Sequence, residues 1–226
     1  VPALRPRVYI PCIHKTRTNK KTLDFNFTND FSEEKLSIYD ILEGKRAPKE
    51  FYISEYEKDV IKMWNEFYLG LNIKTIGFPV WAEEFKSKIE SKNLPEWKQN
   101  FILKNRTLYR ENRTHIDKWL RDNGELRWCN PSHKKFEWQA GEDIRNIYEG
   151  LIQFRPSGVR VKRPNKFSTL VAMNQPQIIG KYLRRLTPDE TKKLQSFPVD
   201  YKLHENNNTA LKHLGNSVNV TVVKNV

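Results

Sequence analysis

One segment near the end of the chain, Gly215-Asn216-Ser217, has residue types that could hold a small polar ligand. Glycine permits a turn with positive φ, and an Asn or Ser beside it can cap a helix. A capped helix start leaves backbone N–H groups pointing outward, where they suit a small polar ligand with a carboxylate. The same residues are typical of an ordinary loop-to-helix cap, and taken alone they favour that structural interpretation.

The stretch from Arg155 to Phe167 has the composition of a surface that binds a polyanion. It holds several basic side chains and no acidic one, and its Pro and Gly residues predict a loop or hairpin. Residues 169–172 then predict a strand. Lysines and arginines placed there can hold phosphates while polar neighbours read base edges, although an amphipathic edge hairpin with a solvated face is the alternative. The candidate DNA contacts are Arg155, Arg160, Lys162, Arg163, Lys166, Thr169 and Leu170.

The composition favours a folded, basic protein of one large or two small domains. Its 226 residues carry a formal charge of +13, with 38% hydrophobic and 12% aromatic residues. This apolar content is too high for a disordered basic tail. The charge indicates a polyanionic partner through counterion release, although a basic solvated surface alone would give the same value. No apolar run approaches the roughly 18 residues of a membrane span, and no signal peptide is found.

The cysteines and tryptophans are interpreted as structural. Only Cys12 and Cys129 are present, which argues against a disulfide scaffold and against a four-cysteine zinc site. We therefore expect no metal centre and a cytosolic compartment that keeps thiols reduced. Most of the six tryptophans, Trp128 and Trp138 among them, are predicted to lie in the core and not to stack on bases.

Two long helices are predicted by apolar residues at helical spacing. The first covers residues 54–71, with Ser54 as its N-cap and Gly70 as its end. The second is a long helical pattern over residues 96–123, which Asn123-Gly124 ends. These helices supply the apolar faces around which a core can form.

Shorter elements are predicted nearer the two ends. Residues 8–10 predict a buried strand, which Pro11 ends, and residues 14–22 predict a polar loop. Thr187 is the expected N-cap of a helix over residues 188–194, with Glu190 as its capping-box partner.

Three short motifs follow one another in the last part of the chain. They are Leu-Thr-Pro at residues 186–188, Leu-Gln-Ser-Phe-Pro at 194–198 and Gly-Asn-Ser-Val at 215–218. Their order and spacing resemble the C-terminal end of the bacterial C5-cytosine DNA methyltransferases. In that family the final block closes over S-adenosylmethionine, and the block before it shapes the junction between the recognition and catalytic domains. The resemblance implies cofactor-binding roles for Asn216, Ser217 and Val218.

Arg5 and Arg7 match the two arginines of the Gln-x-Arg-x-Arg motif in the same family, which also precedes a strand. In the family these arginines lie beside the flipped cytosine and a nearby phosphate, which a guanidinium fork can hold. The resemblance implies a supporting catalytic role for Arg5 and Arg7. Ala3 stands where the family has Gln, so the role of that side chain is lost or taken over. Residues 168–172 resemble the Thr-Leu segment of the family's target recognition domain.

Three catalytic blocks of the family are absent from this sequence. They are the Phe-x-Gly-x-Gly start of the cofactor site, the Pro-Cys-Gln nucleophile and the Glu-Asn-Val acid. Cys12 lacks the following Gln and comes after the arginines, so it is interpreted as structural. Because C5 methylation needs a thiolate and a carboxylic acid, the chain alone is expected to be inactive. Its expected partner is the missing N-terminal methyltransferase part, and Val1 lying inside a motif favours a fragment over a separate subunit.

These features predict an α/β protein: the C-terminal portion of a Rossmann-like methyltransferase domain with a smaller mixed α+β target recognition domain. Residues 1–12 and 181–226 would belong to the catalytic domain, and residues 13–180 to the recognition domain. The expected function is DNA recognition in a restriction-modification methyltransferase of the bacterial cytoplasm, with S-adenosylmethionine as cofactor and duplex DNA carrying a flipped cytosine as partner. Two alternatives stay open: a stand-alone DNA-binding module of methyltransferase descent, and an unrelated basic α+β nucleic-acid binder.

Overall fold

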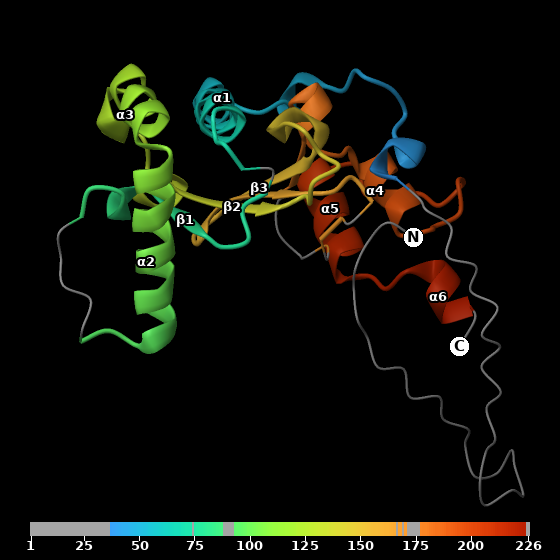
Figure 1. The fold of residues 1–226 in the computed structure, drawn as a ribbon. Coiled ribbons are helices and arrows are strands. Elements are labelled where there is room, and N and C mark those ends of the chain that lie inside the picture. The colour runs from blue at the N-terminus through green and yellow to red at the C-terminus, as the bar shows by residue number, and fades with distance from the viewer. Residues whose placement is uncertain are drawn as a thin grey trace, which may run out of the picture.

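The computed structural model describes residues 37–73, 75–87, 93–165, 167–168, 170 and 177–224. These residues form one five-stranded sheet with helices around it (Figure 1), which confirms the mixed α/β class. The α-helices are α1 (Glu55–Leu69), α2 (Glu96–Glu111), α3 (Arg113–Asp122), α4 (Pro188–Leu194), α5 (Asn207–Asn216) and α6 (Val220–Lys224). The strands are β1 (Val80–Trp81), β2 (Lys135–Gln139), β3 (Leu151–Arg155), β4 (Gly158–Lys162) and β5 (Gln177–Ile179). Short 3-10 helices are η2 (Ile38–Ile41), η3 (Lys49–Phe51), η4 (Ala82–Glu84), η5 (Gly124–Leu126), η6 (Pro131–Lys134), η7 (Ile147–Glu149) and η8 (Gly180–Tyr182).

Helix α1 begins and ends where the sequence predicts. The Ser54 hydroxyl accepts a hydrogen bond from the Glu57 backbone N–H, and the Glu57 carboxylate accepts one from the Ser54 N–H at 2.9 Å. This reciprocal capping box satisfies two N–H groups at the helix start. Gly70 is the C-cap, and the ring of His115 occupies the space that a side chain at this position would need.

The prediction of one continuous helix over residues 96–123 is wrong, because the chain breaks at Asn112 between α2 and α3. Asn112 has φ −120° and ψ 26°, and its Oδ1 accepts a hydrogen bond from the backbone N–H of Asn72 at 3.0 Å. The buried amide therefore ties the junction to the segment after α1. The end of α3 is as predicted, with Asn123 as C-cap and Gly124 at φ +59°.

The prediction that most tryptophans lie in the core is wrong for Trp128. Trp138 is 5% exposed, whereas Trp128 is 42% exposed and Trp97 is 58% exposed. Trp128 follows the tight turn η5, and its indole N–H donates to the Asn123 carbonyl at 2.9 Å. The ring thus lies on the surface, with its edge against Tyr56.

The sheet has the strand order β1-β2-β4-β3-β5. Strands β2 and β4 run parallel, and all other neighbouring pairs are antiparallel. The basic stretch forms the predicted hairpin, in which β3 and β4 are joined across Pro156 and Ser157. Gly158 has φ +130°, and a Cβ there would stand 2.8 Å from the Lys135 carbonyl oxygen, so this position requires glycine.

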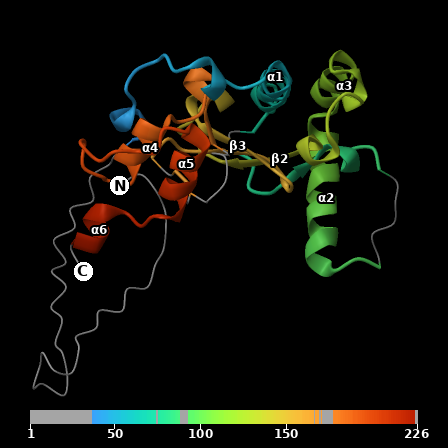
Figure 2. The ribbon, with the colours of Figure 1, turned by 180° about the vertical axis from the view of Figure 1, so that it is seen from behind.

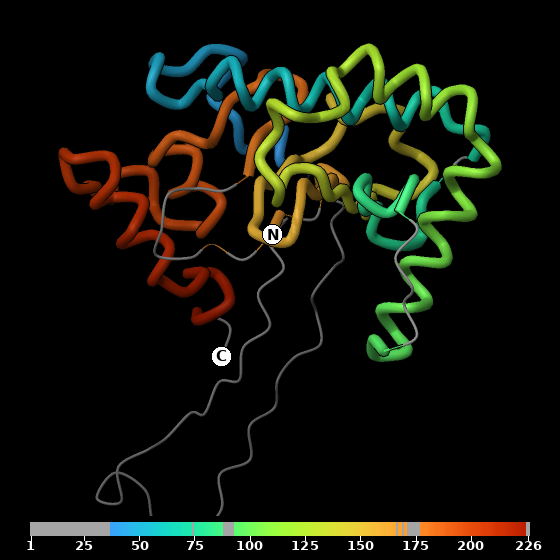
Figure 3. The backbone as a smooth tube through the Cα atoms, turned by 90° about the vertical axis from the view of Figure 1, so that its left-hand side faces the viewer, coloured from blue at the N-terminus to red at the C-terminus, as the bar shows by residue number. Residues whose placement is uncertain are grey.

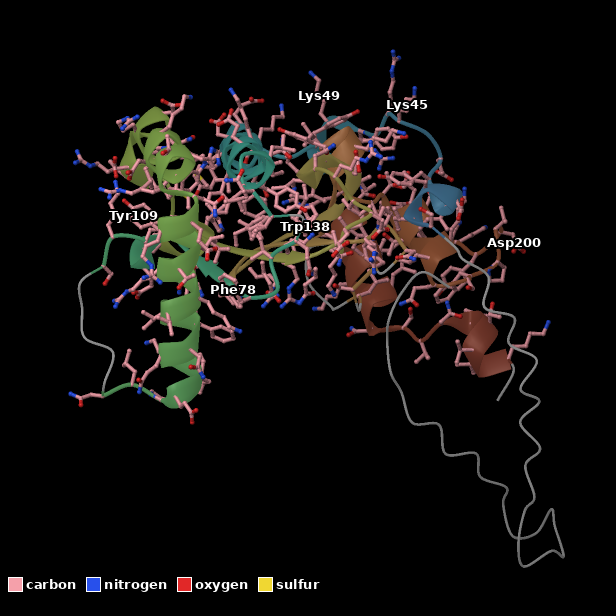
Figure 4. The ribbon with its side chains drawn as sticks, in the orientation of Figure 1. Lys45, Lys49, Phe78, Tyr109, Trp138 and Asp200 are labelled. Atoms are coloured by element: carbon pink, nitrogen blue, oxygen red, sulfur yellow. The ribbon has the colours of Figure 1, made fainter. Side chains whose placement is uncertain are left out.

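One face of the sheet is apolar and is covered by α1. Alternate strand residues point to this face, as the two-residue period of a strand requires. The ring of Phe136 stacks on Trp64 with centroids 4.9 Å apart, and Trp138, labelled in Figure 4, stacks on Tyr68 at 3.8 Å. The main hydrophobic core lies between α1, α3 and this face of the sheet.

A second apolar cluster lies on the opposite face, at the β3–β5 end of the sheet. It consists of Ile38, Leu151, Phe167, Leu170, Ile179, Leu186 and Leu194. Here residues 37–52 lie beside the segment around Arg184, as Figure 3 shows, and Tyr52 and Arg184 form a β-bridge. The remaining part of this face, over β2 and β4, carries polar side chains.

The C-terminal helices lie at the β5 end of the molecule, and α2 and α3 lie at the β1 end (Figures 1 and 2). Helix α4 has the predicted capping box between Thr187 and Glu190, with Pro188 at its first position. Helix α5 packs against it, and the Gln195 side-chain amide donates to the Leu214 carbonyl at 3.0 Å. The motifs at residues 186–188 and 194–198 therefore build one structural unit with α5.

Several sequence predictions lie outside the described residues. These are the strand at residues 8–10, the loop at 14–22 and most of the strand at 169–172; Leu170 is described and is not part of a strand. Among the described helices, none combines the length and apolar character needed to span a membrane.

Candidate nucleic-acid interface

Strands β2 and β4, together with the adjoining residues of β3 and β5, carry polar and charged side chains on the side of the sheet away from α1. We call this the polar sheet face. Strand register places its members next to one another, because Glu137 pairs with Arg160 across β2 and β4, and Arg160 pairs with Gln153 across β4 and β3. Its solvent-reaching members are Lys135, Glu137, Gln139, Arg155, Arg160 and Lys162, and Gln153 and Gln177 lie beside them but are buried.

Glu137 lies at the centre of this face, between two arginines. The Arg160 guanidinium binds it in a bidentate manner, with Nε 2.9 Å from Oε2 and Nη2 3.1 Å from Oε1. Arg155 Nη1 approaches the same carboxylate at 3.4 Å, and Arg155 also donates to the Ser157 hydroxyl. The three charged side chains are 22–26% exposed, so they are held in place but reach solvent.

The other two described basic residues of the stretch also have partners. Arg163 donates to Asp143 Oδ1 through Nη2 at 2.6 Å and through Nε at 2.9 Å. This hydrogen bond lowers the pKa of the Asp143 carboxyl from its ordinary value. Lys162 donates to the Ser168 hydroxyl at 2.9 Å, and Ser168 lies 3.3 Å from Gln153 Oε1.

The polar sheet face is net basic despite its central carboxylate. It combines four basic side chains (Lys135, Arg155, Arg160 and Lys162) with Glu137, and its remaining members are neutral glutamines. Basic groups beside amides and a hydroxyl are the side chains that contact phosphates and base edges. The arrangement is therefore chemically suited to hold a nucleic-acid backbone.

The Gly-Asn-Ser segment differs from its prediction as a turn that opens a helix. Gly215 and Asn216 form the last turn of α5, Gly215 has no positive φ, and Ser217 is the C-cap. The Ser217 hydroxyl donates to the Leu214 carbonyl at 2.7 Å, so it satisfies an acceptor at the helix end. The next helix, α6, starts at Val220.

A small cavity of about 90 Å³ adjoins this segment. Ser217 and Leu214 line one side of it, and the loop after α4 lines the other. Asn216 is exposed, and within the described part of the chain no residue is a hydrogen-bond partner of its side chain. Its amide is therefore open to a polar ligand. Val218 is half-buried beside it.

Four of the candidate site residues lie outside the described ranges, and one is buried. Arg5, Arg7, Lys166 and Thr169 are not described. Leu170 is 2% exposed in the second apolar cluster, and its contact with DNA stays a prediction. Within the described residues no group of three or more His, Cys, Asp or Glu side chains is placed to hold a metal ion.

Glu137 and Asp143 are the site residues that the sequence interpretation missed. The stretch 155–166 contains no acid, but these two carboxylates reach it from β2 and from the loop after β2. A signal was present, because residues 135–139 alternate between polar and apolar side chains. That alternation predicts a strand with Glu137 on its polar face, although not its position beside β4.

Comparison with known proteins identifies the family. A family model described as C-5 cytosine-specific DNA methylase matches residues 1–226, and the chain belongs to this family.

Two curated relatives carry further detail. The chain is 37% identical over 135 residues to the type II methyltransferase M.AluI of Cellulosimicrobium cellulans. This match covers 59% of the present chain and 26% of M.AluI. It is 58% identical over 43 residues to the type II methyltransferase M.BanI of Aneurinibacillus aneurinilyticus. This second match covers 19% of the present chain and 10% of M.BanI. The matched segments thus span about a quarter and a tenth of these relatives. No solved structure gives a significant match.

Proposed function

We propose that this chain is the DNA-recognition part of a type II cytosine-5 DNA methyltransferase, which transfers a methyl group from S-adenosylmethionine to cytosine in duplex DNA. The family membership and the similarity to two type II methyltransferases support the reaction class. In this proposal residues 13–180 form the recognition domain, and residues 1–12 and 181–226 belong to a Rossmann-like catalytic domain. Arg5 and Arg7 would then lie near the flipped cytosine.

The polar sheet face is the observation that carries the DNA-binding part of the proposal. Its basic side chains come from adjacent strands and lie on one surface, with Arg160 and Lys162 in the same strand. Each phosphate that such a surface neutralises releases counterions, so affinity falls as salt rises. Arg163, Lys166 and Thr169 would extend the contact beyond the hairpin.

A salt titration of duplex binding tests this assignment. We expect the double variant R160Q/K162Q to reduce the slope of log K against log salt by about 0.9 for each lost phosphate contact. The matched control is R121Q/R127Q, which removes two exposed positive charges, one within α3 and one just after η5. Equal slopes for the two double variants would show that the polar sheet face does not contact DNA.

The cofactor part of the proposal rests on Asn216. When bound, S-adenosylmethionine supplies the methyl group; Asn216, Ser217 and Val218 would line its site, and the amide of Asn216 would bind a polar group of the cofactor. The exposed amide of Asn216 fits this role. In the complete enzyme we expect N216A to weaken cofactor binding by roughly tenfold to over a hundredfold, the cost of a hydrogen bond to a charged group.

Calorimetry beside a melting curve separates this role from a structural one. The control is N208A, which changes an exposed Asn in the same helix. A role confined to the helix end predicts a lowered melting temperature for N216A with unchanged cofactor affinity.

We also expect that the chain alone transfers no methyl group. The chain lacks the Pro-Cys-Gln block. Cys129 is also unsuited to attack a base, because it is 4% exposed and burial raises the pKa of its thiol. A raised pKa leaves less of the reactive thiolate. Labelled S-adenosylmethionine and mixed-sequence DNA provide the assay, and incorporation into cytosine by the pure chain would contradict this expectation. A polypeptide with the missing blocks should restore transfer.

A further inference from the structure

The basic hairpin does not present its arginines as free cations. Arg155 and Arg160 both bind the carboxylate of Glu137, which comes from β2 and not from the hairpin itself. The Glu137 side chain is 25% exposed, and the two arginines are 26% and 22% exposed. A partner in solution can therefore reach the edge of each guanidinium while the carboxylate still holds it.

The geometry of this contact is that of an anion in a guanidinium fork. Arg160 meets both oxygens of Glu137 through Nε and Nη2, the same bidentate arrangement in which arginine binds a phosphate. Glu137 thus occupies the place that a phosphate oxygen pair would take. A phosphate that binds Arg160 in this way must displace the carboxylate or share the guanidinium with it.

Such a contact contributes little to the stability of the fold. Ion pairs that reach solvent contribute little net stability, because solvent screens the charges. The same carboxylate lowers the net positive charge that the surface offers to a polyanion, since it offsets one of four positive charges. Its larger effect is on binding.

We propose that Glu137 acts as an internal competitor of DNA phosphate, which positions Arg155 and Arg160 and limits sequence-independent binding to duplex DNA. The inference rests on the proposed function, because it assumes that the polar sheet face meets DNA. Phosphates that fit the surface replace the carboxylate on both arginines. A DNA backbone whose phosphates are poorly placed gains too little binding free energy to displace the carboxylate.

Replacement of Glu137 with Gln tests the proposal, because Gln keeps the shape of the side chain and removes its charge. With a short duplex of mixed sequence, we expect E137Q to bind more tightly than the wild type at low salt. The slope of log K against log salt should become steeper by up to about 1.8, or about 0.9 for each of the two released arginines. A variant that damages the fold would weaken binding, which is the opposite sign.

The matched control is D117N on α3. Asp117 is 24% exposed and also contacts two basic side chains, with Lys86 at 3.0 Å and Arg113 at 3.5 Å. D117N makes the same change in net charge as E137Q, but on the side of the sheet that carries α1. It should leave the slope unchanged. E137D, which keeps the charge, should also bind as the wild type does.

The triple variant E137Q/R155Q/R160Q shows whether the gain acts through the two arginines. It should return to the slope of R155Q/R160Q. The proposal is overturned if E137Q leaves the slope unchanged. It is also overturned if D117N steepens the slope as much as E137Q does, or if the steeper slope persists in the triple variant. If neither the wild type nor E137Q shows salt-dependent binding, the proposed DNA contact itself fails; if the wild type binds and E137Q keeps its slope, only the role of Glu137 fails.

Discussion

Arg184 and Glu190 form a bidentate ion pair that is completely buried. Arg184 Nη1 lies 2.8 Å from Glu190 Oε2, and Arg184 Nη2 lies 2.8 Å from Oε1; the side chains are 0% and 1% exposed. The guanidinium also donates to the Gly44 carbonyl at 2.8 Å, and the carboxylate accepts from the Glu43 backbone N–H at 3.2 Å. The pair therefore joins the start of α4 to residues 43–45.

Removal of one charge from this pair should be strongly destabilising. In E190Q the Arg184 guanidinium stays buried without its counter-charge, and such a change costs about 3–5 kcal/mol. Urea denaturation of the chain measures the free energy of unfolding. The control is E43Q, which breaks the exposed ion pair with Lys193 and should cost at most about 1 kcal/mol. Similar losses for the two variants would contradict the assignment.

Glu57 should give the fold a stability that depends on pH. Burial raises the pKa of its carboxyl, but the Ser54 N–H and the Arg185 guanidinium outweigh burial and hold the pKa below the ordinary value of 4.5. The charged form is thus favoured in the folded chain. Its contribution is fully present above pH 4.5 and is lost as the pH falls through the lowered value.

The variant E57Q isolates this contribution, because Gln can still complete the capping box. The difference in unfolding free energy between wild type and E57Q should be constant above pH 5 and should shrink below 4.5. E55Q, which changes a side chain that is 84% exposed, serves as control. A difference that does not vary with pH would contradict the electrostatic origin.

Gly180 should not tolerate a side chain. A Cβ there would stand 2.8 Å from the carbonyl oxygens of Ile147, Tyr148 and Gly150, and these backbone atoms cannot yield easily. We expect G180A to destabilise the chain by about 1–3 kcal/mol in thermal or urea unfolding. Gly77 has no atom within 4 Å of its Cβ position, so G77A should be neutral or slightly stabilising. A neutral G180A would show that η7 can move aside.

Asn105 should couple α2 to β1. Its side chain is fully buried; Oδ1 accepts from the Trp81 backbone N–H at 2.7 Å, and Nδ2 donates to the Pro79 carbonyl at 3.0 Å. N105A leaves these backbone groups without their partner, at a cost of about 1–3 kcal/mol for each buried group. N100A, at an exposed position of the same helix, is the control. Equal unfolding midpoints would argue against the coupling.

Elements whose signals lie within a few residues of one another could be predicted from the sequence. The capping boxes at Ser54 and Thr187 each depend on a residue three positions later, and both helix starts are confirmed. The break at Asn112 could not be predicted in this way. It depends on a hydrogen bond to Asn72, forty positions earlier in the chain, which local spacing does not reveal.

The candidate interface shows the same division. The basic character of residues 155–166 and their hairpin are evident in the sequence. The pairing of Arg160 with Glu137 is not, because it follows from the parallel alignment of β2 with β4, and such pairing is set by tertiary packing. The position of Asn216 at the end of α5, rather than before α6, likewise depends on the packing of α5 against α4.

Strand β3 contributes to both apolar clusters at once. Ile152 belongs to the core under α1, and its neighbour Leu151 belongs to the cluster on the opposite face. A shift of one residue in the pairing of β3 would exchange these environments and place Gln153 where an apolar side chain belongs. The two clusters therefore favour the same alignment of β3. The polar sheet face, which includes Arg155 of β3, is thereby positioned by apolar packing on both sides of that strand.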